Sequence, residues 1–305
     1  MKSLRHQAFF YEGVDAFVGE VLPFVQEGLR DGDPIVVVTK TDNLEALREG
    51  LGDDAQRVSL HDAQEWYRSP GRAFSACLEF VGANAGAPCI RAIGEVNWPV
   101  DWADGIEEYA HYEAVFNVIA AEAPVYVVCP YEISSLPDAV IAHARATHPE
   151  IRTAGRGEPS DAYTDADEYC SHLATRIETA PSAEPIELTP DLDAFRRVVA
   201  AQAREANVPL DRIAELLMAV DQVAENALKH GQGGVLARLW ADERRFVCDI
   251  DNEGDGLSET TAGYIPPAAE DEPGRGLWLA RQVCDLVEVL SRDGATRVRL
   301  SMSRA

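Results

Sequence analysis

The chain has 305 residues, with 27 basic and 52 acidic side chains that give a net charge of −25. This length favours two domains, and the acidic balance argues against direct DNA or RNA binding, which requires a basic surface. No apolar run approaches the roughly 20 residues that span a bilayer, and no secretory signal opens the chain. We therefore expect a cytoplasmic protein without membrane contact, with an acidic surface that suits a basic protein partner.

The first half of the chain alternates apolar runs with stretches of helical spacing. The apolar runs predict strands at residues 8–11, 35–39, 58–60, 89–93 and 125–129. Helices are predicted between and after them, at residues 14–29, 41–51, 69–83, 106–120 and 137–146. This alternation predicts a parallel sheet covered by helices on both faces. No GxxxxGK[ST] motif occurs, so we do not expect a P-loop in this sheet.

Polar and aromatic residues follow one of the predicted strands at its carboxyl end. Ligands of doubly wound sheets bind at this edge, and Glu95 and Trp98 could supply a carboxylate and an aromatic wall to a small sensor pocket. A capping glutamate and a packed tryptophan are an equally good interpretation. The six cysteines contain no CxxC pair, so buried reduced thiols are favoured over zinc binding or redox sensing.

Five short motifs are dispersed over the first half. They are His6 with Phe10-Tyr11, Ile93-Gly94-Glu95 with Trp98-Pro99, Tyr112-Glu113-Ala114 with Asn117, Cys129-Pro130-Tyr131 and Thr147-His148-Pro149. Together they resemble the MEDS domain, a sensory module related to RecA and KaiC. The resemblance implies a RecA/KaiC-like parallel-sheet sensor over residues 1–152 that responds to a small-molecule ligand, and it does not fix the ligand.

Residues 153–185 are expected to form a linker that contains one helix. Residues 153–162 are polar and rich in Gly, Pro and Ser, and a helix is predicted from Tyr163 to Glu178. His172 on that helix raises the question of a histidine-kinase phosphoacceptor. The next residue is Leu173, where such sites usually have an acid, and one short helix cannot form their long helical hairpin. We do not favour that role for His172.

A helix predicted over residues 209–230 is the best-defined element of the second half. Its apolar face comprises Ile213, Leu216, Leu217, Val220, Ala224 and Ala227. Gln222, Asn226 and His230 recur every four residues, so they share a stripe beside that face. With Lys229 they offer amide, imidazole and ammonium groups at a helix end, which suits a metal–phosphate unit. A solvated helix face that happens to carry these residues is the alternative.

Two glycine turns follow this helix. A strand predicted at residues 246–250 leads into Asn252-Glu253-Gly254-Asp255-Gly256, where glycines let the backbone approach a flat ring or a phosphate. Further on, Gly274-Arg275-Gly276-Leu277 opens another helix, whose free N–H groups would attract an anion. Either turn alone is more often an ordinary loop. The three elements in this order are much harder to obtain by chance.

The ordered triple resembles the N, G1 and G2 boxes of the GHKL ATP-binding fold, in the short form of RsbW-type anti-sigma-factor serine kinases. The resemblance covers about residues 186–302, and we expect a GHKL (Bergerat) α/β sandwich over residues 186–305. It implies that ATP and Mg²⁺ are the cofactors, with Mg²⁺ held by Asn226. It also implies that the phosphates lie near Lys229, His230, Gly274, Arg275, Gly276 and Leu277, and the adenine near Asn252, Gly254 and Gly256.

The chain departs from the RsbW pattern at two positions. Such kinases carry a glutamate as general base four residues before the box asparagine, where this chain has Gln222, and an amide cannot accept a proton at neutral pH. Glu225 is one residue off and points about 100° away around the helix. Where the family has an aspartate that accepts from the adenine amino group, this chain has Asn252, a neutral and weaker acceptor, with Asp251 beside it. We expect nucleotide binding with weak or absent phosphoryl transfer.

The two resemblances together predict a sensor-coupled anti-sigma factor. The MEDS-like domain would control an RsbW-like domain that binds a sigma factor or a STAS anti-anti-sigma protein, and a serine of the STAS protein would accept the phosphate. The polar segment Leu257–Pro273 would close over the nucleotide as a lid, or form a surface loop. A homodimer is a further implication of the resemblance. The alternatives are a non-catalytic partner-binding module and a sensor histidine kinase.

Overall fold

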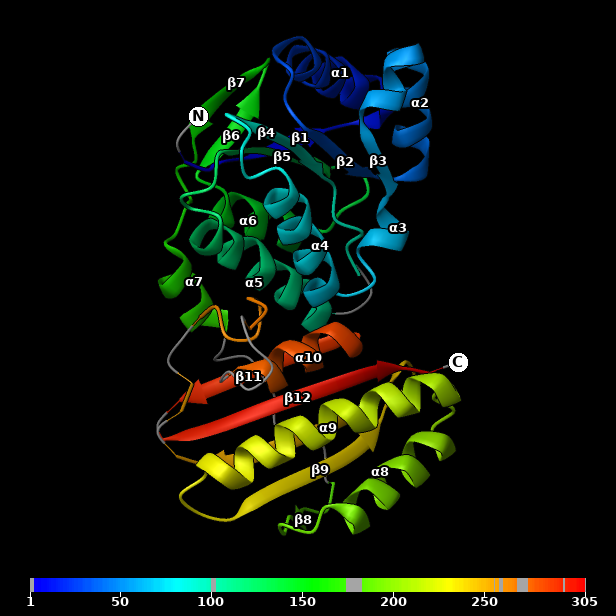
Figure 1. The fold of residues 1–305 in the computed structure, drawn as a ribbon, viewed down its shortest axis with the longest axis vertical. Coiled ribbons are helices and arrows are strands. Elements are labelled where there is room, and N and C mark those ends of the chain that lie inside the picture. Colours follow the sequence, from blue (N-terminus) through cyan, green and yellow to red (C-terminus); the bar gives the residue numbers. More distant parts are fainter. Residues whose placement is uncertain are drawn as a thin grey trace. The chain divides into compact units, whose positions relative to one another are not determined.

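The computed structural model describes residues 3–99, 103–173, 183–254, 256–257, 260–267, 274–292 and 294–304. The chain forms two compact units (Figure 1). The first comprises Met1–Arg68 and Arg72–Cys170, and the second comprises Ser69–Gly71 and Ser171–Ala305. None of the helices in the described ranges combines the length and the apolar character needed to cross a membrane.

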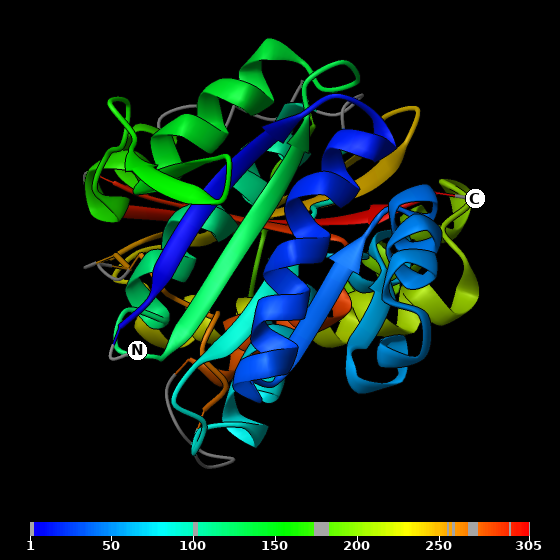
Figure 2. The same ribbon diagram turned by 90° about the horizontal axis from the view of Figure 1, so that it is seen from above.

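The first unit is built on a seven-stranded sheet in the order β3-β2-β4-β5-β1-β6-β7 (Figures 1 and 2). Its strands are β1 (Arg5–Tyr11), β2 (Ile35–Thr39), β3 (Ser59–Asp62), β4 (Ile90–Gly94), β5 (Val125–Glu132), β6 (Glu150–Thr153) and β7 (Arg156–Pro159). All neighbouring strands are parallel except β6 and β7. Every residue of β2 is buried, because helices cover both faces of the sheet. The predicted parallel α/β architecture is confirmed.

Helices lie on both faces of this sheet. On one face are α1 (Gly13–Asp31) and α2 (Thr41–Leu51), and on the other are α4 (Pro70–Ala83), α5 (Ala103–Ile119) and α6 (Asp138–Thr147) (Figure 1). The short elements η1 (Gly52–Arg57) and α3 (Ala63–Trp66) flank β3 in sequence. A core of apolar side chains from α1, α2, β1 and β2 fills the space beneath the first two helices.

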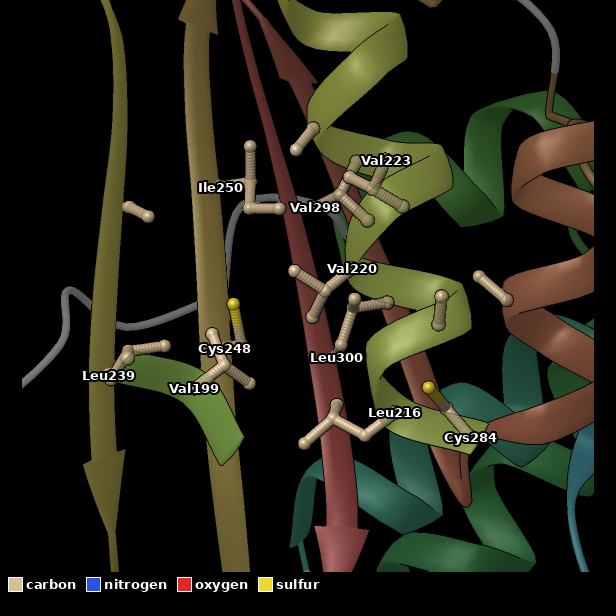
Figure 3. Packing of buried hydrophobic residues seen from close by; sticks show 14 of the residues in the cluster. Val199, Leu216, Val220, Val223, Leu239, Cys248, Ile250, Cys284, Val298 and Leu300 are labelled. Atoms are coloured by element: carbon tan, nitrogen blue, oxygen red, sulfur yellow. The ribbon is translucent and has the colours of Figure 1, made fainter. Parts of the chain in front are cut away.

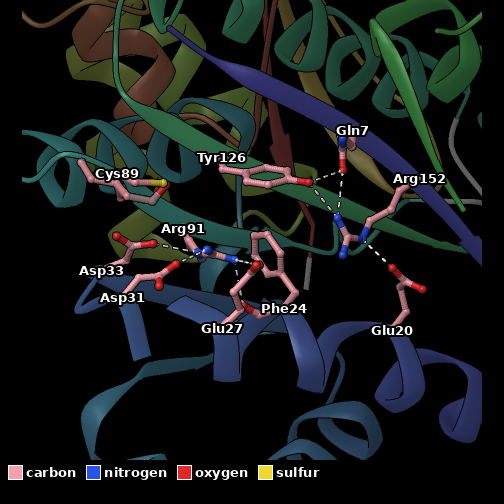
Figure 4. Close-up of polar contacts among 11 residues, drawn as sticks. Gln7, Glu20, Phe24, Glu27, Asp31, Asp33, Cys89, Arg91, Tyr126 and Arg152 are labelled. Atoms are coloured by element: carbon pink, nitrogen blue, oxygen red, sulfur yellow. Dashed lines mark hydrogen bonds and ion pairs between the residues drawn. The ribbon is translucent and has the colours of Figure 1, made fainter. Parts of the chain in front are cut away.

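Two buried arginines fasten α1 to the sheet (Figure 4). Arg91 of β4 donates to Glu27 (2.7 Å), Asp31 (3.1 Å) and Asp33 (2.8 Å). Arg152 of β6 donates to Glu20 at 2.7 Å. Arg91 is paired with three carboxylates, and Arg152 with one carboxylate and with the oxygens of Gln7 and Tyr126. Such pairing is the condition under which a buried charge is tolerated.

The last strand of the sheet, β7, lies in the segment expected as linker. β6 and β7 form a hairpin whose turn residues, Ala154 (φ 48°) and Gly155 (φ 78°), both lie in the left-handed region. Such a turn matches the twist of the flanking strands, and it normally carries Asn-Gly or Asp-Gly. Because Ala at the first position is not a hairpin signal, β7 was not predicted from the sequence. Of the helix predicted at Tyr163–Glu178, the structure contains α7 (Ala166–Leu173), and residues 174–182 lie outside the described ranges.

The second unit is a five-stranded antiparallel sheet in the order β11-β12-β10-β9-β8. Its strands are β8 (Ile186–Glu187), β9 (Val235–Ala241), β10 (Arg245–Glu253), β11 (Leu286–Arg292) and β12 (Ala295–Ser303). Its helices are α8 (Asp193–Glu205), α9 (Leu210–His230) and α10 (Arg275–Val283). The predicted α/β sandwich is confirmed.

One core joins these helices to the sheet. Alternate residues of β10 and β12 face the helices, and the buried cluster includes Cys248, Ile250, Val298 and Leu300. Val220 and Val223 of α9 point toward these strands, as Figure 3 shows. Because α9 is held along its apolar face, its polar stripe keeps a fixed position beside the ends of the strands.

Candidate functional site

The stripe predicted on α9 is present and accessible. The buried face of the helix includes Leu216, Val220 and Ala224, each with no exposed surface. One step around the helix, Gln222 is half-buried, and Asn226 and His230 are exposed close to the C-terminal end. The exposed end thus presents an amide and an imidazole to solvent.

The start of α10 packs directly against this stripe. Gly276 is buried, and a Cβ atom placed on it would lie 2.7 Å from Nδ2 of Asn226 and 3.3 Å from Cβ of Gln222. Only a glycine allows the two helices to approach this closely. The preceding Gly274 has a φ of 94°, in the left-handed region, and acts as the N-cap of α10. The glycines of this turn therefore serve both the turn and the contact with α9.

The end of β10 meets the end of α9. The backbone N–H of Gln232 donates to the carbonyl of Glu253 at 2.8 Å. A Cβ atom on Gly254 would lie 3.1 Å from the carbonyl oxygen of His230 and 3.6 Å from Nδ2 of Asn252. The first glycine turn thus lies beside the C-terminus of α9, and Asn252 is on the helix side of the strand.

Asp251 points to the other side of β10. It forms ion pairs with Arg238 and with Arg297, whose Nε lies 2.6 Å from Oδ1 of the carboxylate. Successive side chains of a strand alternate between faces, so Asp251 and Asn252 cannot both face α9. The acceptor available beside the glycine turn is therefore the amide of Asn252.

Next to Asp251 on this outer face is a fully buried carboxylate, Asp249. Burial raises its pKa, and the bidentate bonds from Arg299 (2.8 and 3.0 Å) oppose that rise. This pair lies among the strands and away from the α9 stripe. Its role is to hold β10 and β12 together, and not to take part in the candidate site.

Part of the segment between the glycine turns packs on α10. Gly263 has a φ of 75°, and a Cβ atom on it would lie 2.7 Å from Cγ of Leu277. Tyr264 is buried, and the guanidinium of Arg281 lies 4.1 Å from its ring centroid. The sequence carried no signal for this contact, because the segment has no periodicity. Of the predicted lid Leu257–Pro273, residues 258–259 and 268–273 lie outside the described ranges.

The remaining predicted residues lie around the same junction. Lys229 and Arg275 are exposed, Gly256 is exposed with a φ of 78°, and Leu277 is buried. The backbone N–H of Leu257 donates to Ser291 Oγ at 2.7 Å, which fixes the chain just after Gly256. Ser291 is a contact that sequence reasoning missed, since nothing in its surroundings in the sequence distinguishes it.

In the first unit, Glu95 is buried within a hydrogen-bond network at the carboxyl ends of the strands. Its carboxylate accepts from Tyr11 at 2.5 Å, from Asn43 at 3.0 Å and from Thr39. Lys40 Nζ lies 3.3 Å from the same carboxylate. Burial, together with the neighbouring Glu95, raises the pKa of Tyr11 above its ordinary value.

Trp98 is buried in an aromatic group at the same edge. Its ring centroid lies 6.0 Å from those of Tyr109 and Tyr131. Its indole N–H has no hydrogen-bond partner among the described residues. Glu95 and Trp98 both lie at the carboxyl edge of the sheet, and the Glu95 carboxylate is engaged by protein donors.

Comparison with protein families assigns both units. Residues 5–149 match the family model of the MEDS domain, the methanogen/methylotroph DcmR sensory domain. Residues 185–302 match that of the histidine kinase-like ATPase domain. The chain carries a MEDS domain followed by a histidine kinase-like ATPase domain. Both assignments confirm the resemblances read from the sequence.

Solved structures similar to the chain include domains of two histidine kinases and a pair of RsbU and RsbW domains. The RsbU and RsbW domains of a Mycobacterium tuberculosis protein are 22% identical, covering 41% of this chain and 34% of that one, with a TM-score of 0.26. The catalytic domain of the histidine kinase ThkA is 14% identical, covering 40% and 96%, with a TM-score of 0.29. The histidine kinase domain of the E. coli osmosensor EnvZ is 14% identical, covering 42% and 92%, with a TM-score of 0.26.

The chain spans about a third of the length of the RsbU–RsbW structure. Because these TM-scores are low, the assignment of the two domains rests on the family models alone. None of the curated proteins matches the chain.

The chemistry open to the ATPase domain follows from its side chains. Asn226 offers a carbonyl oxygen, a ligand suited to a hard cation such as Mg²⁺. The start of α10 offers backbone N–H groups suited to phosphate. Gln222 supplies no carboxylate to deprotonate an attacking hydroxyl. These groups suit the binding of a nucleotide better than its turnover.

Proposed function

We propose that the ATPase domain binds ATP with Mg²⁺ where the end of α9, the end of β10 and the start of α10 meet. The observation that carries this proposal is the contact of Gly276 with Asn226, with a Cβ-to-Nδ2 distance of only 2.7 Å for an added side chain. This contact places Asn226, a possible metal ligand, against the N-terminus of α10, whose backbone N–H groups suit phosphate. Asn226 would bind the Mg²⁺, and Lys229 and His230, both exposed beside it, would neutralise phosphate charge.

Around the base, Asn252 would accept a hydrogen bond from the adenine amino group, since Asp251 is paired on the opposite face. Gly254 and Gly256 would let the backbone pass close to the ring. Gly274, Arg275, Gly276 and Leu277 would border the phosphates at the start of α10. The neutral acceptor weakens selectivity for adenine compared with a carboxylate.

We further propose that the chain is a regulator in which the MEDS domain senses a small molecule and controls the ATPase domain. The partner would be a sigma factor or a STAS anti-anti-sigma protein, and the net charge of −25 favours a basic surface on it. Glu95 and Trp98 would line the sensor pocket once the ligand displaced part of the Glu95 network. Action in the cytoplasm and a homodimer belong to the same proposal.

The kinase reaction, if present, would be slow. Bound ATP–Mg²⁺ supplies a γ-phosphate that a serine hydroxyl of the STAS partner can accept. Phosphoryl transfer depends mainly on positioning and charge neutralisation, which Asn226 and the α10 N-terminus would provide. The amide of Gln222 cannot accept the proton that the serine hydroxyl would lose. This observation favours, as the second candidate, a module that binds its partner without phosphorylating it.

Co-purification from the native cell with identification of the bound proteins tests the regulatory proposal. We expect a sigma factor or a STAS protein to be recovered with the full chain, and its recovery to depend on added ATP–Mg²⁺. Recovery of a response regulator, together with acid-labile phosphate on this chain, would replace the proposal by a sensor histidine kinase. Recovery of neither class of partner would reject it.

A further inference from the structure

Four buried side chains of metal-ligand type converge inside the MEDS domain. They are His6 of β1, Glu113 of α5, Cys129 of β5 and His148, which follows α6, and each is at most 4% exposed. One ligand atom from each lies within 4.8 Å of all the others. They come from four separate elements, so the sheet and its helices bring together residues that are far apart in sequence.

The hydrogen bond between His6 and Asn117 turns Nε2 of His6 toward this cluster. Its Nδ1 lies 2.9 Å from Oδ1 of Asn117. The Nδ2 of Asn117 donates to the carbonyls of Thr147 (2.7 Å) and Glu113 (3.3 Å), so its Oδ1 must be an acceptor. His6 therefore carries a proton on Nδ1, and its Nε2 faces Glu113 and Cys129.

His148 is oriented in the same way. Its Nδ1 donates to the carbonyl of Ala144 at 2.8 Å, which leaves the lone pair on Nε2. This Nε2 is buried without a hydrogen-bond partner among the described residues and lies 3.7 Å from Oε2 of Glu113. The unpartnered Nε2 of His148 thus faces a carboxylate.

Two acceptors that face each other in a buried site are unfavourable unless a cation lies between them. A proton on the Cys129 thiol does not remove the conflict. That thiol lies 3.4 Å from Nε2 of His6, and it can donate there, but Nε2 of His148 would still face Glu113. Fixing the outer nitrogen of each imidazole by a hydrogen bond to an amide or a carbonyl is the arrangement found around metal-bound histidines.

We propose that His6, Glu113, Cys129 and His148 bind one divalent transition-metal ion of the zinc class. Ligand atoms at about 2.0–2.3 Å from a tetrahedral ion lie roughly 3.3–3.8 Å from one another. Three of the six separations are 3.3 Å between His6 Nε2 and Glu113 Oε2, 3.4 Å between His6 Nε2 and Cys129 Sγ, and 3.7 Å between His148 Nε2 and Glu113 Oε2. All six are within 4.8 Å. Two imidazoles, a thiolate and a carboxylate form a donor set that suits zinc.

Charge balance also fits a buried ion. A divalent cation with one carboxylate and one thiolate is neutral overall, so little net charge is buried. On binding, the S–H bond of Cys129 breaks, a sulfur–metal bond forms and the proton passes to solvent. Because the thiol must lose its proton to bind the metal, we expect the metal affinity to increase with pH.

The site forms part of the wall of a cavity of about 40 Å³ inside the MEDS domain. His6, Glu113 and Cys129 are among the residues that line it, and most of the remaining lining is apolar, including Phe116 and Val127. The volume holds a few water-sized groups. An ion held there would face the cavity, so a small ligand that entered it would contact the metal. The inference rests on this domain alone and is independent of nucleotide binding in the ATPase domain.

The test uses the full chain, stripped with a chelator and then titrated with Zn²⁺ or with Co²⁺ as a spectroscopic probe. We expect one zinc per chain by elemental analysis after dialysis. We also expect Co²⁺ to give a thiolate-to-metal charge-transfer band that is lost in Cys129→Ser and kept in Cys77→Ser, since Cys77 lines the same cavity outside the cluster. His148→Gln should weaken the apparent affinity at least ten-fold. Asn117→Ala, a positioning change, should weaken it about 10–100-fold.

X-ray absorption at the zinc edge of the unmutated chain keeps the proposal testable if the variants fail to fold. It should show one sulfur among nitrogen and oxygen neighbours. Less than about a tenth of an equivalent of retained metal, a zinc spectrum without sulfur, or equal loss of the cobalt band in Cys77→Ser and Cys129→Ser would each overturn it. Loss of nucleotide binding with metal binding intact would affect the proposed function only.

Discussion

At the scale of single residues, two positions decide what the candidate site can do: Gly276, which has no side chain, and Gln222, which stands where RsbW-type kinases have a glutamate. Gly276 is where α10 and α9 touch, and it sets the distance between the phosphate-type helix start and Asn226. Gln222 stands beside the same contact, with its Cβ 3.3 Å from the position that a side chain on Gly276 would take. The close contact at Gly276 concerns nucleotide binding, whereas the missing carboxylate at Gln222 concerns catalysis.

Gly276→Ala should weaken ATP–Mg²⁺ binding about ten-fold, which corresponds to about 1.4 kcal/mol. The new Cβ would lie 2.7 Å from Asn226 Nδ2, and the exposed Asn226 side chain can move away, so the fold should survive while the metal ligand is displaced. A fluorescent ATP analogue measures the affinity. Gly234→Ala is the matched control, because nothing lies within 4 Å of an added Cβ there. Equal effects of the two variants would contradict the assignment.

Gln222→Glu should increase serine phosphorylation of a STAS partner about 100-fold or more, since it restores a general base beside Asn226. Transfer from labelled ATP measures this rate. Glu225→Gln, a change on an exposed neighbour of the same helix, should leave the rate as it was. A fast unmutated protein whose rate does not change in Gln222→Glu would show that the reaction needs no base at this position.

At the scale of elements, charged side chains decide how α1 sits on its sheet. Arg91 is 7% exposed, and it is shared by Glu27 and Asp31 of α1 and by Asp33 before β2. The carboxylate of Asp33 is 4% exposed, so it depends on this guanidinium for its charge balance. A buried carboxylate that loses its partner costs far more than a surface pair.

Arg91→Met should destabilise the MEDS domain by about 3–5 kcal/mol, because the buried carboxylate of Asp33 would lose its ion pair with Arg91. Hydrogen exchange of β2 and β4 in the full chain measures the change. Arg57→Met is the control. Its ion pair with Asp54 is more than half exposed on both sides, so the expected cost is below about 1 kcal/mol. A loss for Arg91→Met no larger than for Arg57→Met would show that the guanidinium is not needed by the fold.

Acid should weaken the same junction through Glu27. The hydrogen bond from Arg91 holds the pKa of Glu27 below its ordinary value of 4.5. The unfolded chain therefore takes up this proton first, so the stability is present above pH 4.5 and is lost as the pH falls below it. Glu27→Gln should remove this part of the acid sensitivity, as read from exchange of α1 amides between pH 6 and about pH 3. An unchanged pH profile would argue against the pairing.

At the scale of the whole molecule, periodicity predicted most of the architecture. The apolar run Ile35–Thr39 predicted a strand buried on both faces, and the spacing over residues 209–230 predicted α9 nearly to its ends. The β6–β7 hairpin was missed because its turn is Ala154-Gly155, where the left-handed conformation of Ala154 is set by strand pairing and not by local preference. Local sequence signals do not predict a turn whose backbone conformation is determined by tertiary contacts.

The same limit applies to the sites. Asn226, Asn252 and the glycine turns were predicted as site residues because they follow one another in an ordered pattern. The contact between Gly276 and Asn226, and the meeting of His6, Cys129 and His148, join distant parts of the chain. Spacing along the sequence carries no information on contacts between such distant residues, so they can be identified only from the structure.

Calorimetric titration of the full chain with ATP, with and without Mg²⁺, tests the central claim most directly. We expect saturable binding of one nucleotide per chain that requires Mg²⁺, that weakens at least ten-fold in Asn226→Ala and that stays unchanged in the control Glu225→Ala. Absence of binding at millimolar nucleotide, or equal affinity of the unmutated chain and Asn226→Ala, would show that the junction of α9, β10 and α10 is not a nucleotide site.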